Sequence, residues 1–389
     1  MAVKLRRKEK IVVDRKSIFS LFFVICIFLG VHKTCRALSA EDKLPGEIEF
    51  RRYFHNYNFG GIDWDALIDL KNNPILNACI NGATLAELES LQITDLTARL
   101  QKLQSGNLIR KIDEHYHLNF SVIIGKKQTE LKKLVEEVAL QLLPTTEKMT
   151  EEIVAHLKKN EQMLYHVVWS IVMDGPVAWK TLDNELKKQL GKNDVSIKGT
   201  IWWKYPNHNY LAGTNSYYDD TTKMGTAITW TPTTPMPNVV VENLMPYKDE
   251  IIQSISQNQP IADQDAVEAL AKYGFADEKG ALHIYMLDVN TPAFRTFAKS
   301  GRTFASETMK HLNLQKVAKI LGTSPEEALV IVYHELCYEL LKQLADKGIL
   351  EVPEIALKPK TSSAQMYRLI SITTVSDPVT LQRLLEGEF

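Results

Sequence analysis

The alternation of apolar and polar positions is most regular between residues 74 and 120. Asn81 and Gly82 form a turn pair, because both residue types tolerate positive φ. Thr84 and Glu87 have the spacing of a capping box, which predicts that a helix begins there. This stretch is therefore predicted to contain a short helix, a turn and a second helix.

A third helix and a pair of strands are predicted next. Thr94 can cap this helix, and Gly106 lies where a left-handed residue commonly ends one. Leucines recur in it at i, i+4 and i+7, which places them on one face: Leu96, Leu100 and Leu103. A polar turn at 113–115 and an alternating strand at 116–120 come after it, which predicts a hairpin.

This order of elements resembles the winged helix-turn-helix of MarR-like and ArsR-like regulators. The resemblance covers residues 74–120 of a 389-residue chain and rests on pattern alone. It implies a helix-rich α+β fold with a DNA-reading third helix. The charges argue against DNA, because this stretch has four basic and five acidic side chains, whereas DNA-binding surfaces are normally basic.

Two further charge observations disfavour nucleic acid as a partner. Asp95 stands at the start of the third helix, where it would meet phosphate with the wrong sign. The whole chain has 46 Lys and Arg against 47 Asp and Glu, so no global charge attracts nucleic acid or anionic lipid. A packing or protein-contact role is therefore favoured for residues 74–120.

The N-terminal residues have the layout of a secretory signal. Residues 1–17 are basic, residues 18–31 are apolar apart from Ser20 and Gly30, and small residues stand at −3 and −1 of a cleavage after Ser39. An uncleaved signal anchor and a buried N-terminal helix remain open, although the apolar run is short for a membrane span. Either signal interpretation predicts an extracytoplasmic location for the rest of the chain.

The remaining chain is predicted to fall into four segments. These are a winged-helix-like domain at 40–125, a helical segment at 126–198, an aromatic-rich β segment at 199–245 and a C-terminal α/β domain at 246–389. In the last segment, residues 250–287 and 324–350 repeat the order of helix, glycine, apolar residue and strand, with 366–372 as the last return strand. They are predicted to be degenerate winged-helix units, the third opened by a capping box of Ser324 and Glu327.

The helical segment is predicted to contain two helices. An amphipathic helix over residues 128–144 should end at Pro144, because proline removes a backbone donor. A longer helix over 146–173 is nearly all apolar in its later half. It is a candidate homodimer interface, with intramolecular core as the favoured interpretation.

The aromatic-rich segment supplies the candidate ligand-binding residues. Its aromatic side chains could bind a sugar ring or a peptide, or form the core of a small sheet, which is the favoured interpretation. The five candidates are Trp202, Trp203, Tyr205, Tyr210 and Trp230.

No catalytic, cofactor or metal motif is predicted. In the string from His334 to Glu339, the two outer residues lie about 140° apart on a helix, so they cannot easily share one metal, and a polar helix flank is favoured. His115 and His117 lie on one side of a strand and are interpreted as a solvated pair. In the segment 175–181, which superficially matches a phosphate loop, Trp179 occupies the position that requires glycine.

The cysteines suggest neither zinc nor a disulfide framework. Of the four, Cys79 and Cys337 are favoured as buried free thiols, with pairing left open. The sequence therefore predicts an extracytoplasmic or membrane-anchored protein that binds another macromolecule, with a protein-interaction scaffold as the leading function. A DNA-binding regulator is one alternative, and a carbohydrate-binding protein or hydrolase using Trp202–Trp230 is another.

Overall fold

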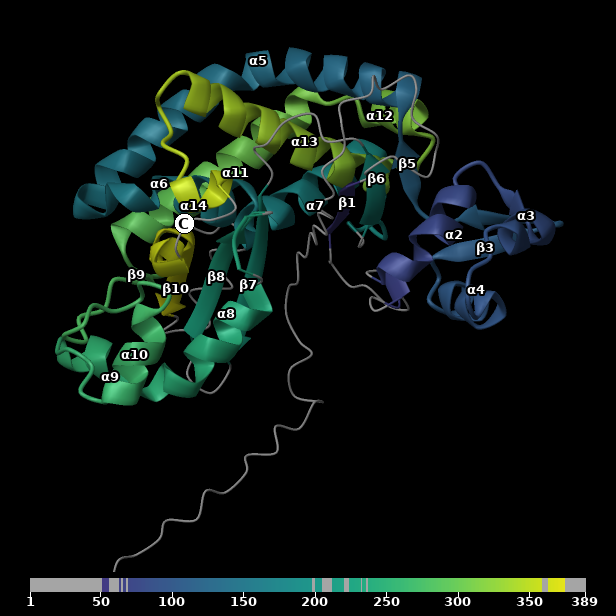
Figure 1. The fold of residues 1–389 in the computed structure, drawn as a ribbon. Helices are drawn as coiled ribbons and strands as arrows, with labels where there is room; N and C mark the ends of the chain where they lie inside the picture. The colour runs from purple at the N-terminus through teal and green to yellow at the C-terminus, as the bar shows by residue number, and fades with distance from the viewer. Residues whose placement is uncertain are drawn as a thin grey trace, which may run out of the picture.

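The protein is a helix-rich α+β structure with three small sheets in its described part (Figure 1). This computed structural model describes residues 51–55, 63, 66–67, 69–197, 200–204, 212–219, 224–231, 233–235, 237–358 and 363–374. The predicted signal segment, residues 1–39, lies outside the described residues. Among the described helices, none is both long and apolar enough to cross a membrane.

A small N-terminal unit, residues 63–120, packs around its own core. It contains η2 (Leu70–Asn72), α2 (Asn73–Ala78), β2 (Ala83–Thr84), α3 (Leu85–Ser90), α4 (Leu96–Ser105), β3 (Ile109–Ile112) and β4 (His115–Leu118). Its strands form an antiparallel sheet in the order β2-β4-β3. One buried side chain from the rest of the molecule, Ile201, joins this core.

Two local predictions in this unit are confirmed. Gly82 has φ of 87°, which is the left-handed turn conformation that glycine adopts at little cost. Thr84 accepts a bond from the Glu87 amide, and the Glu87 carboxylate accepts one from the Thr84 amide at 2.7 Å. This reciprocal capping box begins α3.

Two other local predictions are wrong. Asp95, with φ of 59°, precedes α4 in the N-cap position instead of Thr94, and no side-chain cap bond forms. Gly106 has φ of −79°, and Asn107 takes the left-handed conformation after it, with φ of 57°. Gly106 is required for space, since a Cβ there would lie 2.6 Å from the Cβ of Asp63.

The long helix α5 (Gly125–Leu157) arches over α13 (Pro325–Asp346) and continues through Pro144 (Figure 1). The prediction that Pro144 ends a helix is therefore wrong. Proline at 144 removes the amide that would bond to the Leu140 carbonyl. Leu140 is 65% exposed, so water can satisfy that carbonyl and the helix can bend there.

The predicted helix over 146–173 is not one helix. After α5 the chain forms η3 (Lys158–Met163), α6 (Leu164–His166) and the π-helix η4 (Val167–Met173). The π-helix closes with the Asp174 amide donating to the Trp169 carbonyl at 2.7 Å. Almost all side chains from 163 to 173 are buried, so the core interpretation favoured from the sequence holds for this part of the predicted helix.

Two mixed sheets lie in the main body. One contains β1 (Arg51–His55), β6 (Thr200–Lys204) and β5 (Ser121–Ile123), in the order β1-β6-β5. The other contains β7 (Gly213–Asp219), β8 (Met224–Trp230), β10 (Ile370–Thr374) and β9 (Tyr285–Asp288), in the order β7-β8-β10-β9. Strand β10 is antiparallel to β8 and parallel to β9.

This pairing contradicts the predicted wing of the third repeat. The repeat pattern predicts a hairpin of β10 with residues 348–350, but β10 lies between β8 and β9. Residues 370–372 are all fully buried, so both faces of this strand are covered, as is common for a strand in the interior of a sheet. The predicted return strand therefore completes a four-stranded sheet.

The second predicted repeat is also assembled differently. Helices α9 (Lys248–Gln257) and α10 (Gln264–Ala271) are followed by a single antiparallel bridge between Ala276 and Leu282. Strand β9 then pairs with β10, which is distant in sequence. No local wing forms among the described residues of this segment.

The other helices surround this framework. They are α7 (Pro176–Leu190), α8 (Pro237–Leu244), η5 (Met245–Tyr247), α11 (Pro292–His311), α12 (Leu314–Leu321), α14 (Glu354–Leu357) and η6 (Ser363–Leu369). In α13, residues 328–338 are buried without interruption, as in a helix enclosed on all sides.

The buried side chains of the body form one continuous cluster from Ile123 to Ile372. The segments predicted at 126–198, 199–245 and 246–389 all contribute to it. Cys79 lies in the core of the N-terminal unit and Cys337 in this main core. Both are free and buried, as favoured from the sequence.

Candidate functional site

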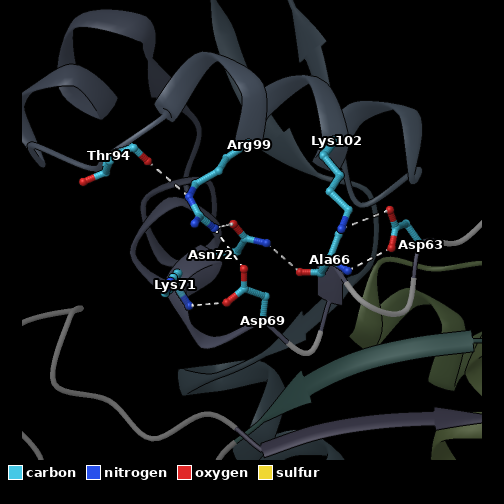
Figure 2. Close-up of polar contacts among 8 residues, drawn as sticks. All are labelled: Asp63, Ala66, Asp69, Lys71, Asn72, Thr94, Arg99 and Lys102. Carbon is cyan, nitrogen blue, oxygen red and sulfur yellow. Dashed lines mark hydrogen bonds and ion pairs between the residues drawn. The ribbon is translucent and has the colours of Figure 1, made fainter.

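Arg99 on α4 is held by the segment that precedes α2 (Figure 2). Its guanidinium donates to Asp69 Oδ2 at 3.0 Å and to Asn72 Oδ1 at 2.8 Å. The side-chain Nδ2 of Asn72 in turn donates to the Ala66 carbonyl at 2.8 Å. Arg99 therefore joins α4 to η2 through a connected set of polar contacts, and the Lys71 amide and Arg99 together lower the pKa of the Asp69 carboxyl.

Lys102, one turn along α4, faces a second carboxylate of the same segment (Figure 2). Its Nζ lies 3.8 Å from Asp63 Oδ2. Asp63 also accepts from the Ala66 amide at 2.9 Å, and its own amide donates to the Gly106 carbonyl. Both cationic side chains of α4 are thus matched by carboxylates from the same chain, and the face of α4 has no excess positive charge.

Apolar side chains are exposed on the N-terminal unit. Leu85, Leu91 and Ile112 are between 41% and 44% exposed. Ile112 and Thr84 flank His115 across the sheet, and Leu85 directly follows Thr84. Half of the large exposed hydrophobic residues in the described part of the chain lie in this one small unit.

The two histidines interpreted as a solvated pair lie on β4 of this sheet. The ring centroids of His115 and His117 lie 6.2 Å apart, and the two residues flank the buried Tyr116 along β4. His117 packs over Gly82, where a Cβ would lie 2.5 Å from the imidazole. No group of three potential metal ligands occurs among the described residues.

The two candidate ligand-binding aromatics whose side chains the structure describes do not share one surface. Trp202 on β6 and Trp230 on β8 are buried and belong to different sheets. Trp230 lies over Gly213, which leaves room for the indole ring. The Trp203 side chain, Tyr205 and Tyr210 lie outside the described residues. Trp202 and Trp230 therefore have packing roles in this structure.

The string at 334–339 is a core element of α13 rather than a polar flank. His334 and Glu335 are buried, and the imidazole of His334 packs against Trp179 and Trp202. His334 Nδ1 lies 2.8 Å from the Val330 carbonyl, so Nδ1 carries a hydrogen. Its Nε2 lies 3.8 Å from Asp174 Oδ1. The prediction of a polar helix flank is wrong at His334 and Glu335, because α13 is enclosed on all sides there.

The sequence pattern does not reveal a buried polar stripe that the structure contains. His166, Ser170 and Asp174 follow one another at intervals of four residues along α6 and the π-helix. Three hydroxyl groups of the four-stranded sheet lie against them: Thr214 on β7, Thr229 on β8 and Ser371 on β10. All six residues are buried.

Hydrogen-bonding distances connect five of these six residues, from Thr214 to Ser371. Thr214 donates to Ser170 at 2.9 Å, and Ser170 and Thr229 are 2.5 Å apart. His166 Nδ1 lies 2.8 Å from the Thr229 hydroxyl, and Nε2 lies 2.9 Å from the Ser371 hydroxyl. The sixth residue, Asp174, has a different partner, since its Oδ1 accepts from Trp179 Nε1 at 2.9 Å.

Burial controls the protonation of the titratable groups in this region. Desolvation raises the pKa of Asp174 to about 7, against smaller opposing effects of hydrogen bonds from Thr214 and Trp179. Desolvation lowers the pKa of His166 to about 3 and that of His334 to about 4. The core therefore holds two neutral imidazoles near neutral pH, and the Asp174 carboxyl titrates close to neutral pH rather than near its ordinary value.

Comparison with known proteins provides no relative. No family model, curated protein or solved structure matches this chain. The function is therefore inferred from the residues of the chain itself.

Proposed function

We propose that the protein is an extracytoplasmic or membrane-anchored protein that binds another protein through its N-terminal unit, with residues 74–120 as a winged-helix-like fold. The observation that carries this proposal is the pairing of Arg99 and Lys102 with Asp69 and Asp63. A DNA-reading helix needs free positive charge for phosphate. Here the cations of α4 are engaged in contacts within the chain.

The order of elements supports the winged-helix-like assignment. A short strand, β2, pairs with β4, and a hairpin of β3 and β4 comes after the third helix. The exposed leucines and Ile112 supply apolar contact area, which protein interfaces bury at their centres. The signal-like residues 1–39 support the compartment, because a basic end before an apolar run favours export of the remaining chain.

Site-specific photo-cross-linking in the native cells tests the proposal. A photoreactive residue would be placed at Leu85 or Ile112, with Val239 and Leu357 as matched controls, since these are 41% and 42% exposed on the main body. We expect one defined protein adduct from positions 85 and 112, and none from the two controls. Equal labelling at all four positions would contradict a partner surface on the N-terminal unit.

The compartment is tested separately. The intact mass of the mature chain and protease access from outside the cell would be measured. A mature chain beginning near Ala40, or a protected N-terminus with an accessible body, supports the proposal. A full-length, soluble and protected chain would contradict it and favour DNA binding instead.

DNA binding is the second candidate, favoured by the helix and hairpin order alone. It needs a basic surface, and the lysines at the start of α5 are the predicted source. Three of these lysines face a glutamate one turn later in the helix: Lys126, Lys132 and Lys133. The fourth, Lys127, donates to the Leu321 carbonyl. Absent or salt-insensitive binding to duplex DNA would exclude this candidate.

A further inference from the structure

Asn119, Phe120 and Ser121 form a short sequence that the proposed partner surface does not use. Asn119 and Phe120 lie at the bend between β4 and β5, where the chain leaves the N-terminal unit. Asparagine followed two positions later by serine or threonine, with no proline between them, is the acceptor sequence of N-linked glycosylation. This is the single such sequence in the 389 residues.

The Asn119 side chain is part-exposed at the base of the β3–β4 hairpin. Its backbone amide donates to the Leu108 carbonyl at 3.0 Å. Its side-chain Nδ2 donates to the carbonyl and to the Oδ1 of Asn107. A glycosylated Nδ2 keeps one hydrogen, so one of these two bonds can remain. A sugar on this nitrogen therefore replaces one surface hydrogen bond and no buried contact.

The Ser121 hydroxyl is engaged once the chain has folded. It donates to Glu327 Oε1 at 2.7 Å, and Glu327 lies 206 positions later in the sequence. The backbone of Ser121 pairs with Trp202 on β6, which is also synthesised later. A chain that is exported as it emerges therefore presents the acceptor sequence before either of these partners exists.

We propose that Asn119 carries an N-linked oligosaccharide, added while the chain is exported. The inference rests on the extracytoplasmic location proposed above, because the reaction takes place on that side of the membrane. The donor is an oligosaccharide linked to a lipid diphosphate. Nδ2 forms a bond to the anomeric carbon of the first sugar, and the bond from that carbon to the diphosphate breaks. Nδ2 loses one proton, and the lipid diphosphate leaves.

The modified nitrogen lies at the opposite end of β4 from the proposed partner surface. Ile112 and His115 pair at the turn of the hairpin, whereas Asn119 directly follows the last residue of β4. Four residues of extended chain separate 115 from 119, which corresponds to about 13 Å. The oligosaccharide is bulky and solvated. It therefore occupies the joint between the N-terminal unit and β5, and leaves Ile112 open to a partner.

Mass spectrometry of the exported chain from its native cells tests the proposal. Peptides that contain residues 119–121 would be mapped before and after peptide-N-glycosidase, which removes the oligosaccharide and converts its asparagine to aspartate. We expect an oligosaccharide mass on the wild-type peptide and its complete loss in Asn119→Gln. An exported chain with unmodified Asn119 would overturn the inference and leave the partner surface standing. A chain that never reaches the outside would refute the proposed compartment, and the glycosylation with it.

Variants of Ser121 and Glu327 separate the acceptor role of the serine from its packing role. Ser121→Ala and Glu327→Ala both remove the contact between β5 and α13, but only Ser121→Ala destroys the acceptor sequence. We expect the oligosaccharide to be lost in Ser121→Ala and retained in Glu327→Ala and Ser121→Thr. An oligosaccharide retained in Ser121→Ala would overturn the assignment, because transfer would then not depend on the acceptor sequence. The wild-type peptide decides the question if a variant fails to fold.

Discussion

At the scale of single residues, Asp174 makes the stability of the fold depend on pH. The group at ion-pair distance from it is His334 rather than a lysine or arginine. The pKa of the Asp174 carboxyl rises from 3.8 to about 7 on folding, because burial removes it from water. Its contribution to stability is therefore full below about pH 4 and is lost as pH rises towards 7, because the unfolded chain then ionises while the folded chain keeps the proton.

The contributions of the two buried histidines to stability change with pH in the opposite direction. Burial lowers the pKa of His166 and His334, so their contribution is full above the ordinary histidine pKa and is lost as pH falls. These contributions are shared by wild type and Asp174→Asn. Comparing the two proteins at each pH therefore isolates the carboxyl group.

We expect Asp174→Asn to gain stability relative to wild type as pH rises from about 4 to 7. The shift of about three pKa units corresponds to roughly 4 kcal/mol in the free energy of unfolding, and the difference should stay constant above pH 7. Urea unfolding followed by tryptophan fluorescence across this range measures it. A difference that is the same at both ends of the range would show that Asp174 is ionised in the folded protein.

At the scale of elements, Pro144 is a local weakness of α5. It lies inside a 33-residue helix and removes one amide from the hydrogen-bond series. Pro144→Ala should raise the free energy of unfolding by about 1–3 kcal/mol, since interior proline costs about 3 kcal/mol relative to alanine. The measurement is chemical denaturation of the full chain.

Pro325→Ala is the matched control for this substitution. Pro325 occupies the first turn of α13, where an amide has no helical partner, so its replacement should bring no gain. The unfolded chain contributes a loss of stability in both variants, because alanine is more flexible than proline. An equal gain from both would therefore show that the gain does not come from restoring the amide inside α5.

Glu327 connects the start of α13 to the strand that leaves the N-terminal unit. Ser324 accepts from the Glu327 amide at 3.2 Å, as the predicted capping box requires. The carboxylate, however, accepts from Ser121 on β5 at 2.7 Å instead of closing the box. Burial raises the pKa of Glu327, and the Ser121 hydroxyl opposes this effect.

A double-mutant cycle on Ser121→Ala and Glu327→Ala measures this link. We expect a coupling of about 0.5–1.5 kcal/mol, typical of a partly buried hydrogen bond. Glu327→Gln should lower the free energy of unfolding less than Glu327→Ala does, because the glutamine side-chain oxygen can still accept from Ser121. Additive effects of the two alanine substitutions would show that the contact contributes no stability.

The contrast between Ser324 and Glu327 shows what the sequence can predict. Caps and turns depend on residues three or four positions apart, so the helix starts at Thr84 and Ser324 are visible in the sequence and the structure confirms them. The partner of Glu327 is 206 positions away, and no local pattern contains it.

The polar stripe is invisible in the sequence for the same reason. His166, Ser170 and Asp174 stand within or beside an apolar run, and a spacing of four in such a run indicates only a helix. Their partners Thr214, Thr229 and Ser371 come from three strands whose order is set by long-range pairing. The helical content of the fold follows from periodicity, whereas the polar stripe requires the sheet to be known.

At the scale of the whole molecule, the buried side chains of the described residues divide into two cores. The core of the N-terminal unit includes Ile201 from β6, and the main core begins at Ile123. Separate cores of different size unfold at different free energies. Heating should therefore give two transitions, with the smaller unit unfolding first.

Alanine substitutions assign these transitions. Ile201→Ala should lower the first transition, because removing a buried isoleucine side chain costs about 2–5 kcal/mol in the core that contains it. Ile228→Ala, on β8 in the main core, should lower the second. Calorimetry of the full chain provides both midpoints. A single transition shifted equally by both substitutions would mean that the N-terminal unit and the body unfold as one, so that the proposed partner surface and the main core form one cooperative structure.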